Sequence, residues 1–317
     1  MGLLTTTIGS FPRSVALRRA RWKFSEEEID AAALRQVEDE ALGQTIALQE
    51  RLGLDLLVDG QFDRGDMITH FAEQLDGMEI GGLVRCFDNR YYRRPRIVGP
   101  LGRSAAITVD RWKAAQALTQ APVKAILIGP YTLMDWSFDE FYPSREECCN
   151  RLAEIVAAEA LELVDAGAAE IQIDEPAISG RPAEIGMVRD AVARVVEPLR
   201  GRARSWLHAC YGDLKPVAAE VLSLPVDGLL LEMVNSRCPW IEDLDALPDD
   251  KLLGAGVIDA VSATDENVDE VRRRIDVLLE KVPADHLWVV PDAGLRSLTE
   301  DEATARLEVM LKAAASF

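Results

Sequence analysis

Short apolar segments alternate with longer amphipathic segments along most of this 317-residue chain, and this alternation restricts the fold more than any other feature of the sequence. Short apolar segments that end in polar or turn-forming residues are typical of buried strands. Eight such segments occur, at residues 3–8, 54–58, 123–128, 169–173, 204–207, 228–231, 252–257 and 286–290. Helical periodicity follows several of them, at residues 144–164, 185–196, 268–279 and 300–314. This order predicts an α/β fold, a TIM (β/α)8 barrel, with a doubly wound parallel sheet as the alternative.

Two local patterns add to this outline. Ser25 and Glu28 are spaced as in a capping box, which predicts that a helix begins there and runs to about Leu52. The stretch near residues 77–102 interrupts the alternation, and we expect a hairpin-like excursion from the barrel. It contains Gly81-Gly82, Tyr91-Tyr92 and the arginines Arg85, Arg90, Arg93, Arg94 and Arg96. Such a stretch is usually a solvated loop, but in an acidic protein it is also suited to hold an anionic ligand or a partner subunit.

The charge balance narrows the range of partners. The chain has 35 Lys plus Arg against 54 Asp plus Glu, a formal net charge of -19. Such a charge repels nucleic acid and anionic membrane surfaces, so neither is expected as a partner. Five cysteines without a secretory segment, and no apolar run near the ~20 residues of a membrane span, predict a cytoplasmic protein. Since no repeat or linker divides the sequence, residues 1–317 are expected to form a single domain.

Polar side chains follow the apolar core of most of the expected strands. They are Ser10, Asp59, Asp174, His208, Cys210, Glu232, Asp259 and Asp292. Because the strand ends of a barrel open on one face, these side chains are expected at one site. His208, Cys210 and Glu232 come from adjacent strands and carry zinc-ligand atoms, which predicts that they converge on one zinc ion. The alternative for each carboxylate is that it caps the next helix or satisfies loop backbone.

Several motifs occur in a fixed order along the chain. They are Thr5-Thr6-Thr7-Ile8-Gly9-Ser10-Phe11-Pro12, Ile128-Gly129-Pro130-Tyr131-Thr132-Leu133 with Trp136-Ser137-Phe138, Ile171-Gln172-Ile173-Asp174-Glu175-Pro176, His208-Ala209-Cys210, and Val290-Pro291-Asp292-Ala293-Gly294-Leu295. Together they resemble the cobalamin-independent methionine synthase family, and the resemblance is to its C-terminal catalytic barrel in a short, single-barrel form. It covers nearly the whole chain, and the ordered set is far more specific than any one motif.

The resemblance implies a zinc-dependent methyltransferase that moves a methyl group from a carrier onto a small thiol such as homocysteine. His208, Cys210 and Glu232 match zinc ligands of the family, and zinc lowers the pKa of a bound thiol so that it attacks as the thiolate. Cys210 and Asp174 are the expected catalytic residues. The methyl carrier is a methyl-folate or a methylcorrinoid, either free or on a carrier protein.

The same resemblance assigns contacts with the substrates. Ile8, Gly9 and Ser10 match the loop that holds the carboxylate of the amino acid substrate. Asp174 matches the carboxylate that binds its ammonium group, and Trp136 matches the aromatic side chain that stacks on the pterin of a folate. Core packing is the alternative for Trp136, because it is the commoner fate of a tryptophan.

Ala293 departs from the family pattern, which has a cysteine as the fourth zinc ligand at this position. One His, one thiolate and one carboxylate with an open position is an ordinary catalytic zinc arrangement. A single sulfur ligand, however, leaves the preference for one metal less defined. Cys238 and Asp292 are the candidates for a replacement ligand.

Gln61 is a second departure, because it stands where the family has a Glu that helps to bind the substrate's amino group. A neutral amide accepts a hydrogen bond from an ammonium group but supplies no charge. The acceptor is therefore either homocysteine or a thiol that lacks an ammonium group. Two further interpretations stay open: a related zinc-thiolate alkyl transfer or thiol-addition enzyme, and a non-catalytic thiol-binding barrel that has lost the fourth zinc ligand.

Overall fold

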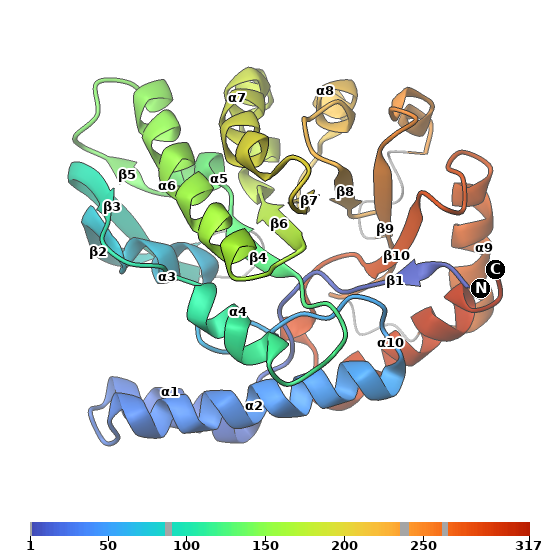
Figure 1. Ribbon diagram of the computed structural model, residues 1–317, viewed down its shortest axis with the longest axis horizontal. Helices are drawn as coiled ribbons and strands as arrows, with labels where there is room; N and C mark the ends of the chain where they lie inside the picture. Colours follow the sequence, from blue (N-terminus) through green and yellow to red (C-terminus); the bar gives the residue numbers. More distant parts are fainter. Residues whose placement is uncertain (1, 86–90, 235–240, 262–265) are drawn as a thin grey trace.

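A parallel β-sheet is the central feature of the computed structural model, which describes residues 2–85, 91–234, 241–261 and 266–317 (Figure 1). Its strands are β1 (Leu4–Thr5), β4 (Ala125–Ile128), β6 (Glu170–Asp174), β7 (Arg204–Ala209), β8 (Gly228–Leu231), β9 (Leu252–Ile258) and β10 (Leu287–Pro291). They lie in the order β1-β10-β9-β8-β7-β6-β4, and each neighbouring pair is parallel. The expected α/β fold is confirmed.

The segment 54–58 joins the two edges of this sheet and completes the barrel. Leu56 pairs with Thr6, next to β1, and Leu57 pairs with Val123, next to β4, both in parallel orientation. The sequence predicts a strand here, and the structure has isolated bridges, because successive residues pair with opposite neighbours. The eight segments predicted as strands therefore form a closed barrel.

Helices cover the outside of the barrel in Figure 1. They are α1 (Val15–Ser25), α2 (Ala31–Leu52), α3 (Met67–Ala72), α4 (Val109–Gln116), α5 (Pro130–Asp135), α6 (Arg145–Asp165), α7 (Ile185–Val196), α8 (Ala218–Leu222), α9 (Val268–Leu279) and α10 (Glu300–Ala314). The helices predicted from periodicity are confirmed as α6, α7, α9 and α10.

The capping-box prediction at Ser25 is wrong. Ser25 is the last residue of α1, and its hydroxyl donates to the Trp22 carbonyl at 2.7 Å. The next helix, α2, begins at Ala31, after Asp30, whose carboxylate accepts from the Ala33 N–H at 2.8 Å. Asp caps a helix as well as Ser does. The spacing of Ser25 and Glu28 therefore does not decide whether the helix begins after Ser25 or after Asp30.

The barrel interior contains an apolar cluster that is separate from the main core between sheet and helices. It consists of Ile8, Leu56, Trp206, Leu230, Trp288 and Val290. The rings of Trp206 and Trp288 meet edge to face, with centroids 5.4 Å apart. Two polar side chains, Lys124 and Gln172, are also almost fully buried, at 1% and 0% exposure. The barrel interior is thus partly polar.

The predicted hairpin-like excursion is present. Strands β2 (Leu75–Arg85) and β3 (Tyr91–Arg103) are antiparallel, and β5 (Phe138–Asp139) runs parallel to β3. Several of its arginines have partners within the chain: Arg96 Nη2 lies 2.6 Å from Glu140 Oε2, and the Arg94 guanidinium lies 3.7 Å from the centre of a phenyl ring. Arg90 lies outside the described residues.

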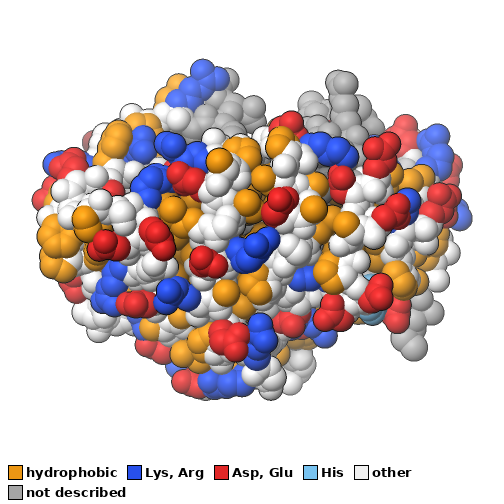
Figure 2. Space-filling view, turned by 90° about the horizontal axis from the view of Figure 1, so that it is seen from above, with side chains coloured by type: hydrophobic (Ala, Val, Ile, Leu, Met, Phe, Trp, Pro, Cys, Tyr) orange, Lys and Arg blue, Asp and Glu red, His pale blue; other side chains and the backbone are white. Residues whose placement is uncertain are grey.

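Acidic and basic side chains are interspersed on the face shown in Figure 2, with small apolar areas between them. The excess of acidic residues, 54 against 35 basic ones, does not gather in a single patch on this face. Membrane insertion has no candidate among the described helices, since none combines the required length with sufficient apolar character.

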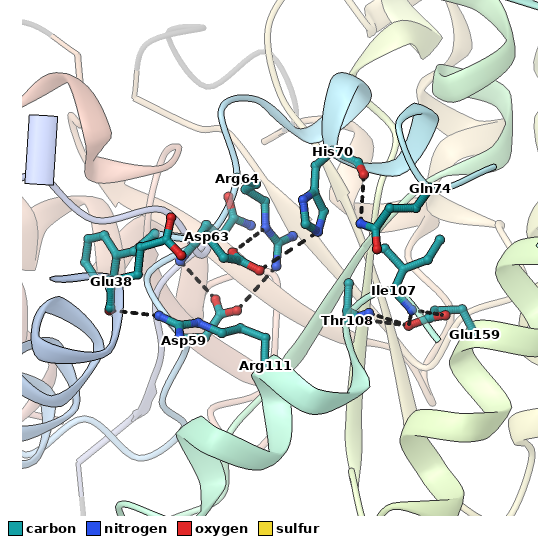
Figure 3. Close-up of polar contacts among 12 residues, drawn as sticks. Glu38, Asp59, Asp63, Arg64, His70, Gln74, Ile107, Thr108, Arg111 and Glu159 are labelled. Carbon is teal, nitrogen blue, oxygen red and sulfur yellow. Dashed lines mark hydrogen bonds and ion pairs between the residues drawn. The ribbon is translucent and has the colours of Figure 1, made fainter. Parts of the chain in front are cut away.

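Glu159, on α6, connects the base of the hairpin to the barrel (Figure 3). Its carboxylate is fully buried and accepts from the N–H groups of Ile107 and Thr108, at 3.0 and 2.6 Å, and from the Thr108 hydroxyl at 2.8 Å. It also forms an ion pair with Arg103 at the end of β3. A buried carboxylate needs donors for its lone pairs, and these groups supply them.

The substitution Glu159→Gln should lower the free energy of unfolding by about 3 kcal/mol, because it leaves Arg103 charged and without its buried partner. The control is Glu162→Gln. Glu162 also pairs with Arg103, but its side chain is 47% exposed, and exposed pairs contribute less than about 1 kcal/mol. Urea denaturation measures both changes. Equal losses in the two variants would contradict the anchoring role of Glu159.

Candidate active site

A cavity of about 530 Å³ opens at the carboxyl ends of the barrel strands. It collects most of the residues to which the sequence analysis gives a role. Those that line it are Ile8, Ser10, Gln61, Trp136, Asp174, His208 and Cys210. Gly9 and Glu232 are not among the lining residues. The closed order of the strands therefore brings together side chains that are up to two hundred positions apart, from Ile8 to Cys210.

His208 and Cys210 stand at the end of β7, and both are buried. His208 Nδ1 lies 3.2 Å from the Leu230 carbonyl oxygen on the neighbouring strand β8. Because a carbonyl only accepts, Nδ1 carries the hydrogen and Nε2 keeps its lone pair. Burial lowers the pKa of His208 to about 4, so the imidazole is neutral near pH 7. A neutral imidazole whose other nitrogen donates to a carbonyl is the form in which histidine binds metals.

The carboxylates of Glu232 and Asp292 contact loop backbone. Glu232 is buried and accepts from the Tyr211 N–H at 2.8 Å. Asp292 is 1% exposed and accepts from two successive N–H groups, those of Met233 and the next residue, at 2.8 and 2.9 Å. These contacts match the alternative considered for strand-end carboxylates, that they satisfy loop backbone. They also place Glu232 next to the loop that follows Cys210.

The predicted zinc ligands are only partly assembled. His208 and Cys210 share the cavity, and Glu232 is bonded to the adjacent loop. Among the residues that the structure describes, no three His, Cys, Asp or Glu side chains are grouped closely enough to hold a metal ion. Ala293 is buried and has no donor atom, and Cys238, one of the candidate replacement ligands, lies outside the described residues.

Asp174 ends β6 and is 4% exposed. Burial raises its pKa to about 7, and this effect outweighs a hydrogen bond from Gln172 and the positive charges of Lys124 and Arg64. The hydrogen bond joins Gln172 Nε2 and Asp174 Oδ1 at 2.6 Å. A desolvated carboxylate in a cavity is suited to bind a cationic group, because the cation restores the favourable interaction that burial removed.

The turn at residues 8–10 forms another part of the cavity wall. Gly9 has φ of 149°, and a Cβ atom there would lie 2.6 Å from Ile126 Cδ1 and 2.9 Å from Gln61 Nε2. The positive φ favours glycine, and a larger residue would also require these two side-chain ends to shift. The Ser10 carbonyl accepts from the Leu295 N–H at 2.7 Å, which ties the turn to the loop after β10.

Gln61 has a left-handed backbone conformation, with φ of 57°. This conformation costs free energy for a residue with a Cβ atom and is frequent near functional sites. The Gln61 N–H donates to Asp59 Oδ1 at 3.1 Å, and Asp59 Oδ2 lies 3.3 Å from Arg64 Nη2. Asp59 and Arg64, which do not line the cavity, thus stabilise the backbone conformation of Gln61.

A buried charge network supports the loop 59–70, which supplies residues 65–68 to the cavity lining (Figure 3). Arg64, whose side chain is 2% exposed, pairs with both Asp59 and Asp63, at 3.3 and 3.2 Å. His70, on α3, lies 3.9 Å from Asp63. Although burial disfavours the charge of Asp63, Arg64 and His70 lower its pKa. The loop is therefore fixed by charges that burial makes strong.

Aromatic side chains form one side of the cavity. The rings of Trp136 and Tyr92 lie with centroids 5.7 Å apart and an interplanar angle of 32°. The Tyr92 hydroxyl donates to the Trp136 carbonyl at 2.9 Å, and both residues line the cavity together with Tyr91. Trp136 thus lines the cavity and is also a partly buried side chain that packs against the main core, the alternative given for it.

A cavity at the carboxyl ends of parallel barrel strands, with a few polar side chains such as Asp174 and His208 in its lining, is the site arrangement of TIM-barrel enzymes, and fold and site together define this class. Within it, the chain belongs to the family described as "Cobalamin-independent synthase, Catalytic domain", whose model matches residues 3–316. The family predicted from the ordered motifs is confirmed.

Curated relatives and solved structures agree with this assignment. Proteins named 5-methyltetrahydropteroyltriglutamate–homocysteine methyltransferase from Mycolicibacterium paratuberculosis and Salinibacter ruber are 36% and 34% identical over 322 residues. The alignments cover 98% of this chain and 43% and 42% of the relatives, so the chain spans less than half of their length. The structure of a B12-independent methionine synthase from Shewanella sp. W3-18-1, in complex with selenomethionine, has a TM-score of 0.88 at 27% identity and covers 100% of this chain and 97% of that one. A putative B12-independent methionine synthase from Listeria monocytogenes shares the fold, with a TM-score of 0.83 at 21% identity over 99% of this chain and 98% of that one.

Sequence reasoning gave no role to several residues that shape the site. Gln172 donates a hydrogen bond to Asp174. The sequence contains a signal for this contact, because side chains two residues apart on a strand lie on the same face. Arg64 and Lys124 have no such signal, because their partners come from distant parts of the chain. Tyr211, which follows Cys210 directly, lines the cavity and has a left-handed φ of 63°.

His70 should make stability depend on pH. Burial lowers its pKa from 6.5 to about 4, so between these values the unfolded chain binds a proton that the folded chain does not. The stability that neutral His70 contributes is present above pH 6.5 and is lost as the pH falls toward 4. From pH 7 to pH 4.5, we expect His70→Gln to lose about 2 kcal/mol less than the wild type. Urea denaturation at each pH measures this, and parallel curves would contradict it.

Proposed function

We propose that this chain is a zinc-dependent S-methyltransferase that transfers a methyl group from a methyl-folate to the thiol of homocysteine or of a closely similar amino acid. The observation that carries the proposal is that the His208–Cys210 pair, Asp174 and the turn at residues 8–10 contribute to one cavity. Membership of the cobalamin-independent synthase family supports it, and the curated relatives are named as homocysteine methyltransferases.

Zinc is the metal whose usual ligands match these residues. The donor set would be an imidazole kept neutral by burial, a thiol two positions later and a carboxylate from the next strand. His208 and Cys210 would hold the ion from the end of β7, and Glu232 would be the third ligand. Bound zinc lowers the pKa of a thiol and so favours the nucleophilic thiolate. Since the Ala293 side chain has no atom that could bind the metal, one coordination position would stay open for a ligand from outside the chain.

Residues of the chain itself would bind and orient the acceptor. Ser10 and the backbone of the turn would hold a carboxylate, and Asp174 would hold an ammonium group. These two contacts would direct the sulfur toward His208 and Cys210. The thiol would give up its proton to solvent, its sulfur would form a bond to the methyl carbon, and the donor nitrogen would leave with the electron pair of its broken bond to that carbon and take up a proton from solvent. Orientation of the two reactants is the main contribution that such a site makes to the rate.

The aromatic side of the cavity would receive the donor. Trp136 and Tyr92 present ring faces, and a volume of about 530 Å³ lies within the range of small-molecule sites. A flat pterin ring would stack there, as aromatic pairs do. This arrangement favours methyl-folate as the donor, with methylcorrinoid as the alternative to be compared in the assay.

Cys210→Ser should remove both zinc and activity. We expect the wild type to contain about one zinc per chain and to methylate L-homocysteine with methyl-tetrahydrofolate, and the variant to lose most of the zinc and at least ~10-fold in rate. Metal content by mass spectrometry and product formation by chromatography measure the two effects.

The matched control is Cys148→Ser, because Cys148 is buried on α6 and does not line the cavity. Equal zinc content in the two serine variants, or a wild type without zinc, would overturn the zinc assignment. Activity with methylcobalamin but not with methyl-folate would show that the donor is a methylcorrinoid. A wild type without activity on any donor and thiol would favour the non-catalytic interpretation.

Gln61→Glu should strengthen the binding of an amino-acid thiol. The added carboxylate supplies a charge for the substrate's ammonium group, and a charge-assisted hydrogen bond is roughly twice as strong as a neutral one, so we expect a fall in the Kd for L-homocysteine of about 10-fold. Isothermal titration calorimetry measures it. The control ligand is 3-mercaptopropionate, which has no ammonium group and should bind no better to the variant. Tighter binding of both thiols would refute the assigned contact.

A further inference from the structure

We infer that Lys124 and Gln172, inside the barrel, are positioning residues that set the spacing between the turn at residues 8–10 and Asp174. Neither side chain lines the cavity. The inference rests on the proposed function, because it takes the turn and Asp174 as the two contacts for an amino acid. The inference assigns a role to the polar side chains of the barrel interior. Packing alone does not require polar side chains there.

Gln172 bonds both parts of the amino-acid site. It is fully buried on β6, and its Nε2 donates to the Ile8 carbonyl at 2.8 Å and to Asp174 Oδ1 at 2.6 Å. Both partners are acceptors, so the amide orientation is fixed, since a flipped amide would place Oε1 against two oxygens. One side chain thus connects the turn after β1 with the carboxylate at the end of β6.

Lys124 holds the preceding carbonyl of the same turn. Its Nζ donates to the Thr7 carbonyl at 2.8 Å, and the residue is 1% exposed. Burial lowers the pKa of Lys124 to about 7, while Asp174 and Glu170 favour its charged form. A methionine would fill similar space without the cost of desolvating an amine. The amine is therefore better explained by its bond to Thr7 than by packing.

The two bonds together determine how the turn presents its backbone. Thr7 and Ile8 are consecutive, and both carbonyls are held from the barrel interior. In a trans peptide the C=O and N–H groups point in opposite directions, so the same bonds set the directions of the Ile8 and Gly9 N–H groups. On the other side, the Ser10 carbonyl accepts from the Leu295 N–H at 2.7 Å. The turn is thus fixed from two sides.

Spacing matters because an α-amino acid carries its carboxylate and ammonium groups on one carbon atom. Two protein contacts serve both groups at once only if their separation is held within about 0.5 Å. Gln172 fixes this separation through two hydrogen bonds that share one nitrogen atom. Without it, the turn and Asp174 would both remain, but their spacing would relax and they would no longer bind the two groups together.

The test is binding of L-methionine, the product amino acid, to the full chain without a methyl donor. Gln172→Met should raise the Kd at least ~10-fold, and Lys124→Met should change it in the same direction. The matched control is Lys251→Met. Lys251 is also a buried lysine, but the backbone carbonyls that its Nζ bonds, one of them that of Val226 at 2.7 Å, precede β8, at the end of the barrel away from the cavity.

Calorimetry gives the Kd values, and thermal unfolding of the same samples gives the stability of each variant. A purely structural role would lower the unfolding temperatures of Gln172→Met and Lys251→Met alike and leave their affinities equal, which would overturn the inference. If Gln172→Met does not fold, Gln172→Asn replaces it, because the shorter amide cannot reach both partners. A wild type that binds neither L-methionine nor L-homocysteine would instead refute the proposed acceptor.

Discussion

Closure of the barrel at residues 54–58 is the constraint on which the rest of the structure depends. Successive residues of this segment pair with opposite neighbours, so no regular ladder forms, and side chains replace part of the missing backbone pairing. Asp55 accepts from the N–H and the hydroxyl of Thr5, both at 2.8 Å, and the Thr6 hydroxyl donates to the Leu56 carbonyl at 2.8 Å. Backbone bonds on the other side join Leu57 to the start of β4. Without these bonds the sheet would remain open between β1 and β4, and the rim would not surround a cavity.

The same joint also builds the wall of the site. Gln61 lies three residues after Val58, and Gly60 forms a bridge with Ser10, so two loops that line the cavity meet where the barrel closes. The left-handed backbone at Gln61 is stabilised by Asp59, and Asp59 by Arg64. Strain near the cavity is thus offset by buried charges a few residues away, which is a common arrangement at functional sites.

Local pattern was sufficient to predict the strands of the barrel and the helices α6, α7, α9 and α10, whereas contacts between distant segments were not predictable. Apolar alternation located the strands around the barrel, and the position of His208 and Cys210 just after one of them indicated the correct rim. The pattern failed at Ser25, where two capping residues compete and tertiary packing decides. It left open whether Glu232 and Asp292 hold a ligand or bond loop backbone, and it could not identify the N–H groups that they bond, because these partners belong to other loops whose course depends on the whole fold.

The barrel interior shows how packing and function divide the same space. Trp206 and Trp288 fill one part with apolar surface, which stabilises the fold by burial. Lys124 and Gln172 occupy another part, where apolar side chains would avoid the cost of burying an amine and an amide. Their bonds reach backbone and carboxylate groups of the cavity wall, so the desolvation cost is offset by a rim whose geometry is fixed before any ligand binds. Preorganisation of this kind reduces the entropy lost on binding, and it accounts for two polar side chains in a barrel interior that is otherwise packed with apolar ones.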